Sequence, residues 1–313
     1  MTEAGSQLKV TVIIVTYNSE GEIGGCLETV IPQIESVGGE VIVVDNASTD
    51  ETVERIKPHL PALREQAGRA QRDDITLIVN EKNLGFSRAN NQALEKARGE
   101  FVFLLNPDTR MEPGTVGTLI KKLKEDETLG AVAPQLRFPD GRIQYSCRRF
   151  PTYGAVLSEL SGLSKLFPHA KTFNGWKMGD FDHRSPREVD QPAAAALMIR
   201  TDLLRRLGGF DEDFWMFFSD VDLCRRIGEK KRILFTPEAV VIHRGGASVN
   251  PRKASMIVSS HRSFIRYFRK WHRGPVQQVM NILMAVLLYL VMGVRVVWAG
   301  VRPAGRRAKR RAL

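Results

Sequence analysis

The chain has 313 residues, of which 43% are hydrophobic and 26% charged. These proportions are typical of a globular protein and disfavour a disordered chain, a collagen-like repeat and a bundle of membrane spans. The formal net charge is +11, but residues 262–313 contain 12 Lys or Arg and no Asp or Glu, so the first 261 residues hold 34 basic and 35 acidic side chains. The folded part therefore lacks the basic surface of a nucleic-acid-binding protein, and the positive charge belongs to a tail.

The cysteines and the N-terminus bear on the compartment. Cys26, Cys147 and Cys224 form no CxxC pair and no metal-ligand spacing, which predicts reduced thiols and a cytosolic core. The first residues, MTEAGSQLK, contain no apolar stretch, so we expect no signal peptide.

Apolar, β-branched runs alternate with helical patterns in the first half of the chain. Ser19 with Glu22, and Ser48 with Glu51, match the capping box that begins a helix. This alternation predicts an α/β fold with a mostly parallel, doubly wound sheet. The expected strands are 10–16, 40–45, 75–80 and 100–106, and the later helices run from about Ser87 to Arg98 and from about Pro113 to Asp126.

The second half is less regular. Residues 130–150 resemble a hairpin around the turn Pro139-Asp140-Gly141, and residues 151–188 predict a loop-rich insertion with one or two short helices. We expect one main domain over 1–250, with a first half at about 9–134 and a second half at about 135–250, and a helical tail over 251–313. The remaining expected elements are a strand at 194–199, helices at 201–207 and near 220–228, and a strand at 232–243.

Polar side chains follow each of the first four strands. Asx, Ser and Gly are ordinary turn and cap residues, which explains any one such loop. Four such loops at one sheet edge favour a ligand site instead, because ligands of open α/β sheets bind beyond the carboxyl ends of the strands. The loops are 16–19 (TYNS), 45–48 (DNAS), 83–86 (NLGF) and 106–109 (NPDT).

These loops, in this order, resemble those of glycosyltransferase family 2, whose members are inverting enzymes of the GT-A fold that use nucleotide-sugar donors. The resemblance covers residues 9–246. It implies that the loops after the first two strands hold base and ribose, and that the GFSRAN stretch lines the nucleotide. The donor-binding residues that it implies are Thr16, Tyr17, Asn18, Asp45, Asn83, Gly85, Phe86, Asn90, Asn106 and Asp108.

The resemblance also implies a divalent metal, Mg²⁺ or Mn²⁺. The family's DXD signature corresponds to residues 106–108, where Asn106 replaces the first carboxylate and Asp108 keeps the last. His243 matches the histidine of the HxxGxS segment, which implies a second ligand, although a lone histidine at a strand end is more often structural. A hard cation held by a carboxylate would neutralise a diphosphate leaving group. A phosphate loop of the GxxxxGK[ST] type and a GxGxxG turn after the first strand are both missing, which disfavours NTPases and Rossmann dehydrogenases.

A second cluster matches the acceptor side of the family. The segment GGFDE followed by FFSDVDLC implies that Asp220 is the catalytic base, although an aspartate at that position also caps helices. Ser219 stands where the family usually has Glu. The acceptor-side residues that the resemblance implies are Gly209, Phe210, Asp211 and Asp222.

Residues 189–200 and 135–150 are similar to the rhamnosyltransferase-like branch that builds bacterial surface polysaccharides. This similarity implies dTDP-L-rhamnose as donor and a polysaccharide or polyprenyl-diphosphate-linked saccharide as acceptor. A second hypothesis is a non-catalytic, nucleotide-sugar-binding scaffold of a polysaccharide-assembly complex. A third, specific nucleic-acid binding by the tail, is disfavoured by the charge distribution.

The tail contains an apolar run at 282–294, extended to 301, between basic flanks. Because both flanks are basic, the positive-inside rule gives no direction of crossing. This symmetry favours a helix in or dipping into the cytoplasmic leaflet, with residues 262–313 attracted to anionic lipid. One true span over 279–301 and a soluble oligomer contact are the alternatives. We therefore expect a peripheral or monotopic protein at the cytoplasmic face of the cell membrane.

Overall fold

A computed structural model of the chain describes residues 8–60, 75–168, 170–245 and 254–301. The chain divides into two compact units. The large unit consists of Met1–Trp215 and Ser219–Ser248, and the helical unit of Met216–Phe218 and Val249–Leu313. The boundary expected at residue 250 and the basic residues from Arg302 onward lie outside the described residues.

Four parallel strands form the first part of the main sheet, in the order β3-β2-β1-β4. Every residue of β2 and β4 is buried, as expected for strands covered on both faces. The carboxyl ends of all four strands therefore meet at one edge. The strands are β1 (Val10–Thr16), β2 (Gly39–Asp45), β3 (Ile75–Val79) and β4 (Phe101–Leu105).

The sheet continues as a mixed sheet beyond β4. Strand β11 (Ala196–Arg200) runs antiparallel to both β4 and β6 (Leu129–Arg137). Strand β12 (Arg232–His243) is parallel to β6, and its last residues pair antiparallel with β5 (Thr109–Met111). The α/β architecture is confirmed, and β11 is the strand whose reversed direction the sequence pattern did not predict.

Short strands extend this half. Strand β7 (Ile143–Gln144) pairs with β6, which confirms a small hairpin in the region 130–150. Strand β9 (Arg187–Glu188) pairs with β12. Strands β8 (Cys147–Arg148) and β10 (Gln191–Pro192) form a separate antiparallel pair.

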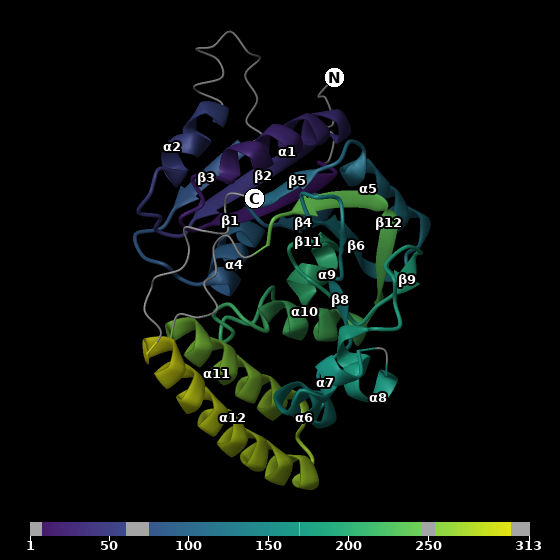
Figure 1. Cartoon of the computed structure of the whole chain (residues 1–313). Coiled ribbons are helices and arrows are strands. Elements are labelled where there is room, and N and C mark those ends of the chain that lie inside the picture. The colour runs from purple at the N-terminus through teal and green to yellow at the C-terminus, as the bar shows by residue number, and fades with distance from the viewer. Residues whose placement is uncertain (1–7, 61–74, 169, 246–253, 302–313) are drawn as a thin grey trace, which may run out of the picture. The chain divides into compact units, whose positions relative to one another are not determined.

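Helices cover both faces of the main sheet (Figure 1). On one face, α1 (Ile23–Val37), α2 (Thr52–Ile56) and α5 (Thr115–Glu125) pack on side chains such as Ile14 and Val43. On the other face lie α4 (Phe86–Lys96), α9 (Thr201–Arg206) and α10 (Ser219–Gly228), which pack on residues such as Ile13 and Leu104. A short 3₁₀ helix, η1 (Lys57–His59), follows α2.

The insertion at 151–188 holds more helix than expected. It contains α6 (Tyr153–Ser161), α7 (Leu163–Leu166), α8 (Lys171–Asn174) and the 3₁₀ helix η2 (Gly175–Lys177). The Thr152 hydroxyl accepts from the N–H of Ala155 and caps α6. These helices are too short to show a clear apolar period in the sequence.

The two expected capping boxes are wrong. Helices α1 and α2 begin after Glu22 and Glu51, without a side-chain cap from either residue. The N–H of Ser19 instead donates to Thr52 Oγ1 at 2.7 Å, and the Ser48 hydroxyl donates to Asp45 at 2.5 Å. Both serines therefore join loops at the carboxyl edge of the sheet.

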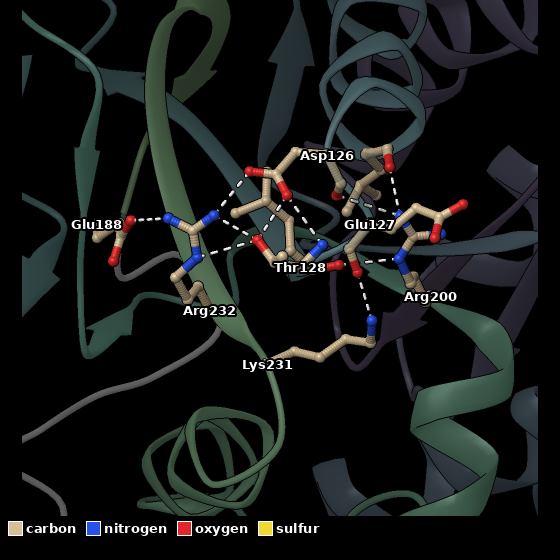
Figure 2. A network of polar contacts seen from close by, with 9 residues as sticks. Asp126, Glu127, Thr128, Glu188, Arg200, Lys231 and Arg232 are labelled. Atoms are coloured by element: carbon tan, nitrogen blue, oxygen red, sulfur yellow. Dashed lines mark hydrogen bonds and ion pairs between the residues drawn. The ribbon is translucent and has the colours of Figure 1, made fainter.

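A polar network holds the opposite edge, where β6 and β12 begin (Figure 2). Arg200 Nε donates to Leu129 O at 2.8 Å, and the same guanidinium donates to the carbonyl of Leu123 in the last turn of α5. Arg232 pairs with Asp126 at 2.8 Å. The network secures the turn between α5 and β6 and is completed by Glu127, Thr128, Glu188 and Lys231.

The helical unit contains α11 (Ala254–Trp271) and α12 (Pro275–Val301). Met284, Ala285 and Leu288 of α12 are buried, as are Ile265 and Phe268 of α11. The segment Pro275–Trp298 of α12 is long and apolar enough to cross a membrane. No other helix of the described ranges is both that long and that apolar.

Candidate active site

Side-chain hydrogen bonds join the loops after β1 and β2. Thr16 and Asp45 are opposite each other in the register of the two strands, and Thr16 Oγ1 donates to Asp45 Oδ1 at 2.9 Å. The Asp45 carboxylate also accepts from the N–H and the hydroxyl of Ser48. Asp45 is 1% exposed, so in this structure its carboxylate orders the loop, and its contact with a donor remains a prediction.

Asn18 shapes the same edge through an uncommon backbone conformation. Its φ is +51°, and that of Ala47 in the facing loop is +65°; Asn adopts this region more readily than most residues. Asn18 Oδ1 accepts from the N–H of Thr49 at 2.8 Å, and its own N–H donates to Ser48 Oγ at 2.9 Å. The side chain of Tyr17 is left 38% exposed at this edge.

The side chain of Asn46 links the loop after β2 to the segment after β3. It was not among the expected site residues. Its Nδ2 donates to Asn83 Oδ1 at 2.9 Å and to the Gly85 carbonyl at 3.2 Å. Its Oδ1 accepts from the N–H of Leu84 at 2.9 Å and from Asn80 Nδ2 at 3.2 Å. The signal that could have revealed it is a polar side chain directly after the strand-ending Asp45, since such positions lie at the ligand-binding edge.

The start of α4 holds the loop that precedes α10. Gly85 has φ +86°, and a Cβ there would lie 2.4 Å from Trp215 Cδ1. The N–H of Phe86 donates to the Trp215 carbonyl at 2.7 Å, and the Phe86 ring meets the edge of Phe210 with centroids 5.5 Å apart. Gly85 and Phe86 therefore connect the start of α4 with the loop that precedes α10.

The neighbouring asparagines of α4 differ in role. Asn90, expected to line the nucleotide, is buried and donates to the Phe86 carbonyl of its own helix at 2.8 Å. Asn91 instead donates to the Phe210 carbonyl at 2.9 Å and accepts from its N–H at 2.8 Å. A Cβ on Gly209, whose φ is +69°, would lie 2.4 Å from Asn91 Oδ1. Asp211 accepts from the N–H of Asp213 in a local turn.

Asp108 and His243 come together as the sequence predicted. His243 Nε2 lies 3.3 Å from Asp108 Oδ1, and both side chains are largely buried. His243 Nδ1 lies 2.8 Å from Gln144 Oε1, an acceptor that favours a proton on Nδ1. With Nδ1 as the donor, Nε2 presents a lone pair toward Asp108. Two electron-pair donors this close need a proton or a cation between them, so the pair fits a divalent metal.

Asn106, in the segment expected to bind the metal, contributes differently. Asn106 takes part through its main chain: its N–H donates to the Ala195 carbonyl at 2.9 Å, and its own carbonyl accepts from Thr109 Oγ1 at 2.7 Å. No group of three or more His, Cys, Asp or Glu gathers within the described ranges. Within those ranges Asp108 and His243 are the expected metal ligands that lie together, and their role as ligands remains a prediction.

A pocket of about 280 Å³ adjoins Asp108. Arg110 and Arg244 line it, together with Glu22, whose carboxylate pairs with Arg244 at 2.7 Å. Arg110 also lies near Glu28, at 3.9 Å. Guanidinium groups beside a carboxylate that is expected to bind a metal suit an anionic ligand.

Asp220 lies in the first turn of α10 and is partly exposed. Burial raises its pKa, against the N–H groups of Val221 and Ala194 and the charge of Arg148, which lower it. The Val221 N–H donates to Oδ1 at 2.9 Å. A carboxylate with a raised pKa is a better proton acceptor, which suits a general base.

Asp222 does not stand with Asp220 at the site. It is fully buried, and its carboxylate accepts from Arg226 Nε at 2.9 Å. Arg226 in turn donates to the carbonyls of Leu207 and Gly209 at 2.9 and 2.8 Å. Asp222 therefore anchors the Gly208-Gly209 turn, and the expected acceptor contact is not supported by this placement. The neighbouring Ser219 is also buried.

Arg148 is a second residue that the sequence did not single out. It belongs to β8, and its guanidinium lies 5.8 Å from the ring centroid of Trp176. Burial lowers its pKa, and the charges of Glu159 and Asp220 raise it. The insertion at 151–188 thus brings an aromatic ring and charged groups toward the acceptor side.

Ala194 and Ala195, two consecutive residues just before β11, contact both Asp220 and the segment that contains Asp108. A hydrogen bond from the Ala194 N–H lowers the pKa of Asp220, and the Ala195 carbonyl accepts from the N–H of Asn106. A mixed sheet of this topology, with the Asp108–His243 pair after β4 and Asp220 at the start of α10, fits a glycosyltransferase of the GT-A class.

Comparison with known proteins gives the family. The model of glycosyl transferase family 2 matches residues 11–182, and the chain belongs to this family of enzymes. It is 25% identical over 291 residues to the N-acetylglucosaminyl-diphospho-decaprenol L-rhamnosyltransferase of Mycobacterium tuberculosis, covering 87% of each chain. It is 26% identical over 243 residues to the O-antigen biosynthesis protein RfbC of Myxococcus xanthus, covering 77% of this chain and 18% of that protein.

Solved structures share the fold. The mannosyltransferase PcManGT from Pyrobaculum calidifontis, in complex with GDP-Man and Mn²⁺, aligns with a TM-score of 0.55 at 22% identity, covering 95% of this chain and 74% of that one. S. aureus TarS aligns with a TM-score of 0.54 at 16% identity, covering 91% and 71%. The GT-A architecture is thus confirmed.

Proposed function

We propose that this glycosyltransferase is an inverting, metal-dependent enzyme that moves L-rhamnose from dTDP-L-rhamnose to a lipid-linked saccharide. The observation that carries the proposal is the Asp108–His243 pair at 3.3 Å, at the sheet edge where the loops after β1 and β2 also end. The choice of sugar and acceptor is supported by the relative that matches 87% of the chain, whose name specifies an L-rhamnosyl group and a diphospho-decaprenol carrier.

The donor binds across the ends of β1, β2 and β4. Tyr17 supplies an exposed aromatic ring for the base, and Asn46 and Asp45 keep the surrounding loops in place. Asp108 and His243 would hold Mg²⁺ or Mn²⁺, which neutralises charge on the diphosphate when bound. Arg110 and Arg244, in the adjoining pocket, supply further positive charge.

Asp220 is the general base of the proposed reaction. It accepts the proton of the acceptor hydroxyl as that oxygen attacks the anomeric carbon from the side opposite the diphosphate. The new C–O bond forms while the bond from the anomeric carbon to the β-phosphate oxygen breaks, and dTDP leaves with the bonding electron pair. Attack from the opposite side inverts the anomeric configuration.

The acceptor site lies beside Asp220. Trp176 and Arg148 provide a ring and a cation there, a combination suited to a saccharide and its diphosphate. A lipid-linked acceptor places the reaction at a membrane, and the long apolar helix α12 is consistent with work at its cytoplasmic face.

The test is calorimetric binding of UDP, dTDP and GDP, and then of their sugars, with Mg²⁺ and with chelator. We expect dTDP to bind only with metal and Asp108→Ala to abolish this binding. Asp202→Ala is the matched control, because Asp202 is an exposed aspartate of α9 whose carboxylate pairs with the exposed Arg206.

Transfer is then measured with the donor that binds, and the anomeric configuration of the product is read by NMR. Asp220→Asn should bind donor normally and fail to transfer. A folded protein that binds donor but transfers to no acceptor, even as wild type, would support the scaffold hypothesis instead.

A further inference from the structure

Helix α12 carries an apolar ridge opposite the face that is buried. The ridge residues recur every three or four positions, so they share one side of the helix. The buried face contains Asn281, Met284, Ala285 and Leu288. The apolar ridge, each member more than half exposed, consists of Val276, Val279, Leu283, Val286, Leu290, Val294 and Val297.

Helix α11 packs along α12 and carries a row of positively charged side chains. Asn281 Nδ2 donates to the His272 carbonyl at 2.9 Å beside the turn, and near the far end Arg295 is close enough to His261 to contribute to lowering its pKa, after the larger effect of burial. The two helices are therefore antiparallel neighbours. Exposed arginines at spacings of four and three form an arginine ridge on α11, which consists of Arg262, Arg266 and Arg269.

A hollow at the turn between α11 and α12 is lined by both positively charged and apolar side chains. Its volume is about 460 Å³, and Arg269 and Arg273 line it together with Ile282 of α12. Two guanidiniums beside an exposed aliphatic side chain match the phosphate and the first acyl carbons of an anionic phospholipid.

We propose that the helical unit docks on an anionic bilayer as a helical hairpin parallel to the surface, with the apolar ridge of α12 among the acyl chains and α11 at the level of the lipid phosphates. The inference deepens the membrane partner of the proposed function and does not depend on its chemistry. Neighbouring helices lie about 8–10 Å apart, so α11 sits at headgroup height when α12 is immersed at the boundary of the hydrocarbon.

A spanning orientation conflicts with the same packing. Pro275–Trp298 has 24 residues, about 36 Å of helix, which is long enough to cross. Since α11 packs beside α12, a spanning α12 would carry the arginine ridge into the hydrocarbon, where charged side chains are strongly disfavoured. In the surface orientation those arginines remain among phosphates.

Vesicle flotation of the full-length protein tests the docking. We expect binding to vesicles of equal parts phosphatidylcholine and phosphatidylglycerol, and binding at least about 10-fold weaker to phosphatidylcholine alone. Leu283→Glu with Leu290→Glu should abolish flotation with both. The matched control is Leu157→Glu with Leu166→Glu, which makes the same changes at exposed leucines of α6 and α7 and should float like the wild type.

Two triple variants, one of the arginine ridge and one of control arginines, test the role of α11. Arg262→Gln, Arg266→Gln and Arg269→Gln together should remove the preference for phosphatidylglycerol. Arg55→Gln, Arg142→Gln and Arg206→Gln change the net charge equally at exposed positions of the large unit and should retain it. Equal losses in both sets would mean that only total charge matters and would overturn the role of α11.

Labelling decides the orientation. Gln277→Cys and Arg295→Cys lie at exposed positions near the two ends of α12, and the native thiols Cys26, Cys147 and Cys224 are buried. An impermeant maleimide added outside the vesicles should label both new cysteines. Labelling of only one would show a spanning helix and overturn the proposal.

Two further outcomes count against docking. If wild-type protein floats with neither vesicle, the proposal fails. If Leu283→Glu with Leu290→Glu converts a dimer into a monomer in light scattering and leaves flotation unchanged, a second copy covers the apolar ridge instead. The proposed function is tested separately by dTDP binding, so a protein that floats but binds no nucleotide would overturn that function and leave the docking intact.

Discussion

His243 Nε2 and Asp108 Oδ1 are 3.3 Å apart, and His243 Nδ1 is held at 2.8 Å from Gln144 Oε1. The residue pair comes from β12 and the turn before β5, whose register places His243 opposite Thr109. The hairpin strand β7 supplies Gln144. The proposed metal ligands and the group that orients His243 thus come from three segments of the chain.

We expect Gln144→Ala to weaken metal-dependent nucleotide binding by about 10-fold, because residues that orient metal ligands typically contribute that much or more. Calorimetry with Mg²⁺ or Mn²⁺ measures the loss. Arg142→Ala, at an exposed position before the same strand, should bind like the wild type. Unchanged binding in Gln144→Ala would remove the orienting role.

Asp220→Asn should lower kcat by at least about 100-fold, the usual contribution of a positioned general base. The same change should raise the melting temperature slightly. Burial raises the pKa of Asp220, so its charge destabilises the folded protein at pH values above that pKa, and asparagine carries no charge. Thermal unfolding at neutral pH and at pH 3 checks the sign, because the gain should disappear once the wild-type carboxyl is protonated.

The pH dependence of transfer should report the same group. As a base, Asp220 must be ionised, so kcat/KM should fall as pH drops through its raised pKa. Arg148 lowers that pKa, so Arg148→Met should move the acidic limb to higher pH, and Arg148→Lys should largely restore it. Arg149→Met, at the adjacent residue that faces Asp180, is the control that should leave the limb in place.

Gly85→Ala should destabilise the protein by about 1–3 kcal/mol and weaken donor binding, because it combines a positive φ with a clash against Trp215. Gly114→Ala separates the two effects. Gly114 also has a positive φ, +79°, but has open space around its Cβ position. Urea unfolding of both variants measures the difference, and equal losses would show that the Trp215 contact contributes nothing.

Arg200→Met should cost about 1–3 kcal/mol of unfolding free energy, since it leaves carbonyls of the α5–β6 turn without their donor. Nucleotide affinity should not change, because the network lies at the edge opposite the site. Arg206→Met, which breaks an exposed pair with Asp202, should cost less than about 1 kcal/mol. A loss of dTDP binding in Arg200→Met would contradict this division.

The parallel strands β1 to β4 and the meeting of Asp108 with His243 could be predicted from the sequence. Uninterrupted apolar runs report double-sided burial, and the family resemblance supplied the pairing. The direction of β11 could not be predicted, because an apolar run looks the same in either direction and hydrogen-bonding partners decide it. Ser19 and Ser48 resembled helix caps because each stands three residues before a glutamate. Their actual partners, Thr52 and Asp45, could not be predicted from that spacing.

Residues that act through distant partners were also missed or misplaced. Asn46 stands in one of the polar loops that the sequence singled out, but its partners at Asn83 and Gly85 are distant in the chain, and Arg148 belongs to no local pattern. Asp222 has the right residue type for an acceptor contact, but its position on α10 turns it toward Arg226. Identity alone does not reveal which side of a helix a carboxylate occupies.

The docking of Trp215 on Gly85 limits how members of this family can be recombined. Exchanging residues 9–134 for those of a relative with another donor would separate α4 from the loop that it holds, because Gly85, Phe86 and Asn91 recognise the backbone and rings of residues 209–215. A chimera must therefore transfer both segments together. The segment expected to line the donor and the segment expected to face the acceptor are thus packed against each other and have to be exchanged as one unit.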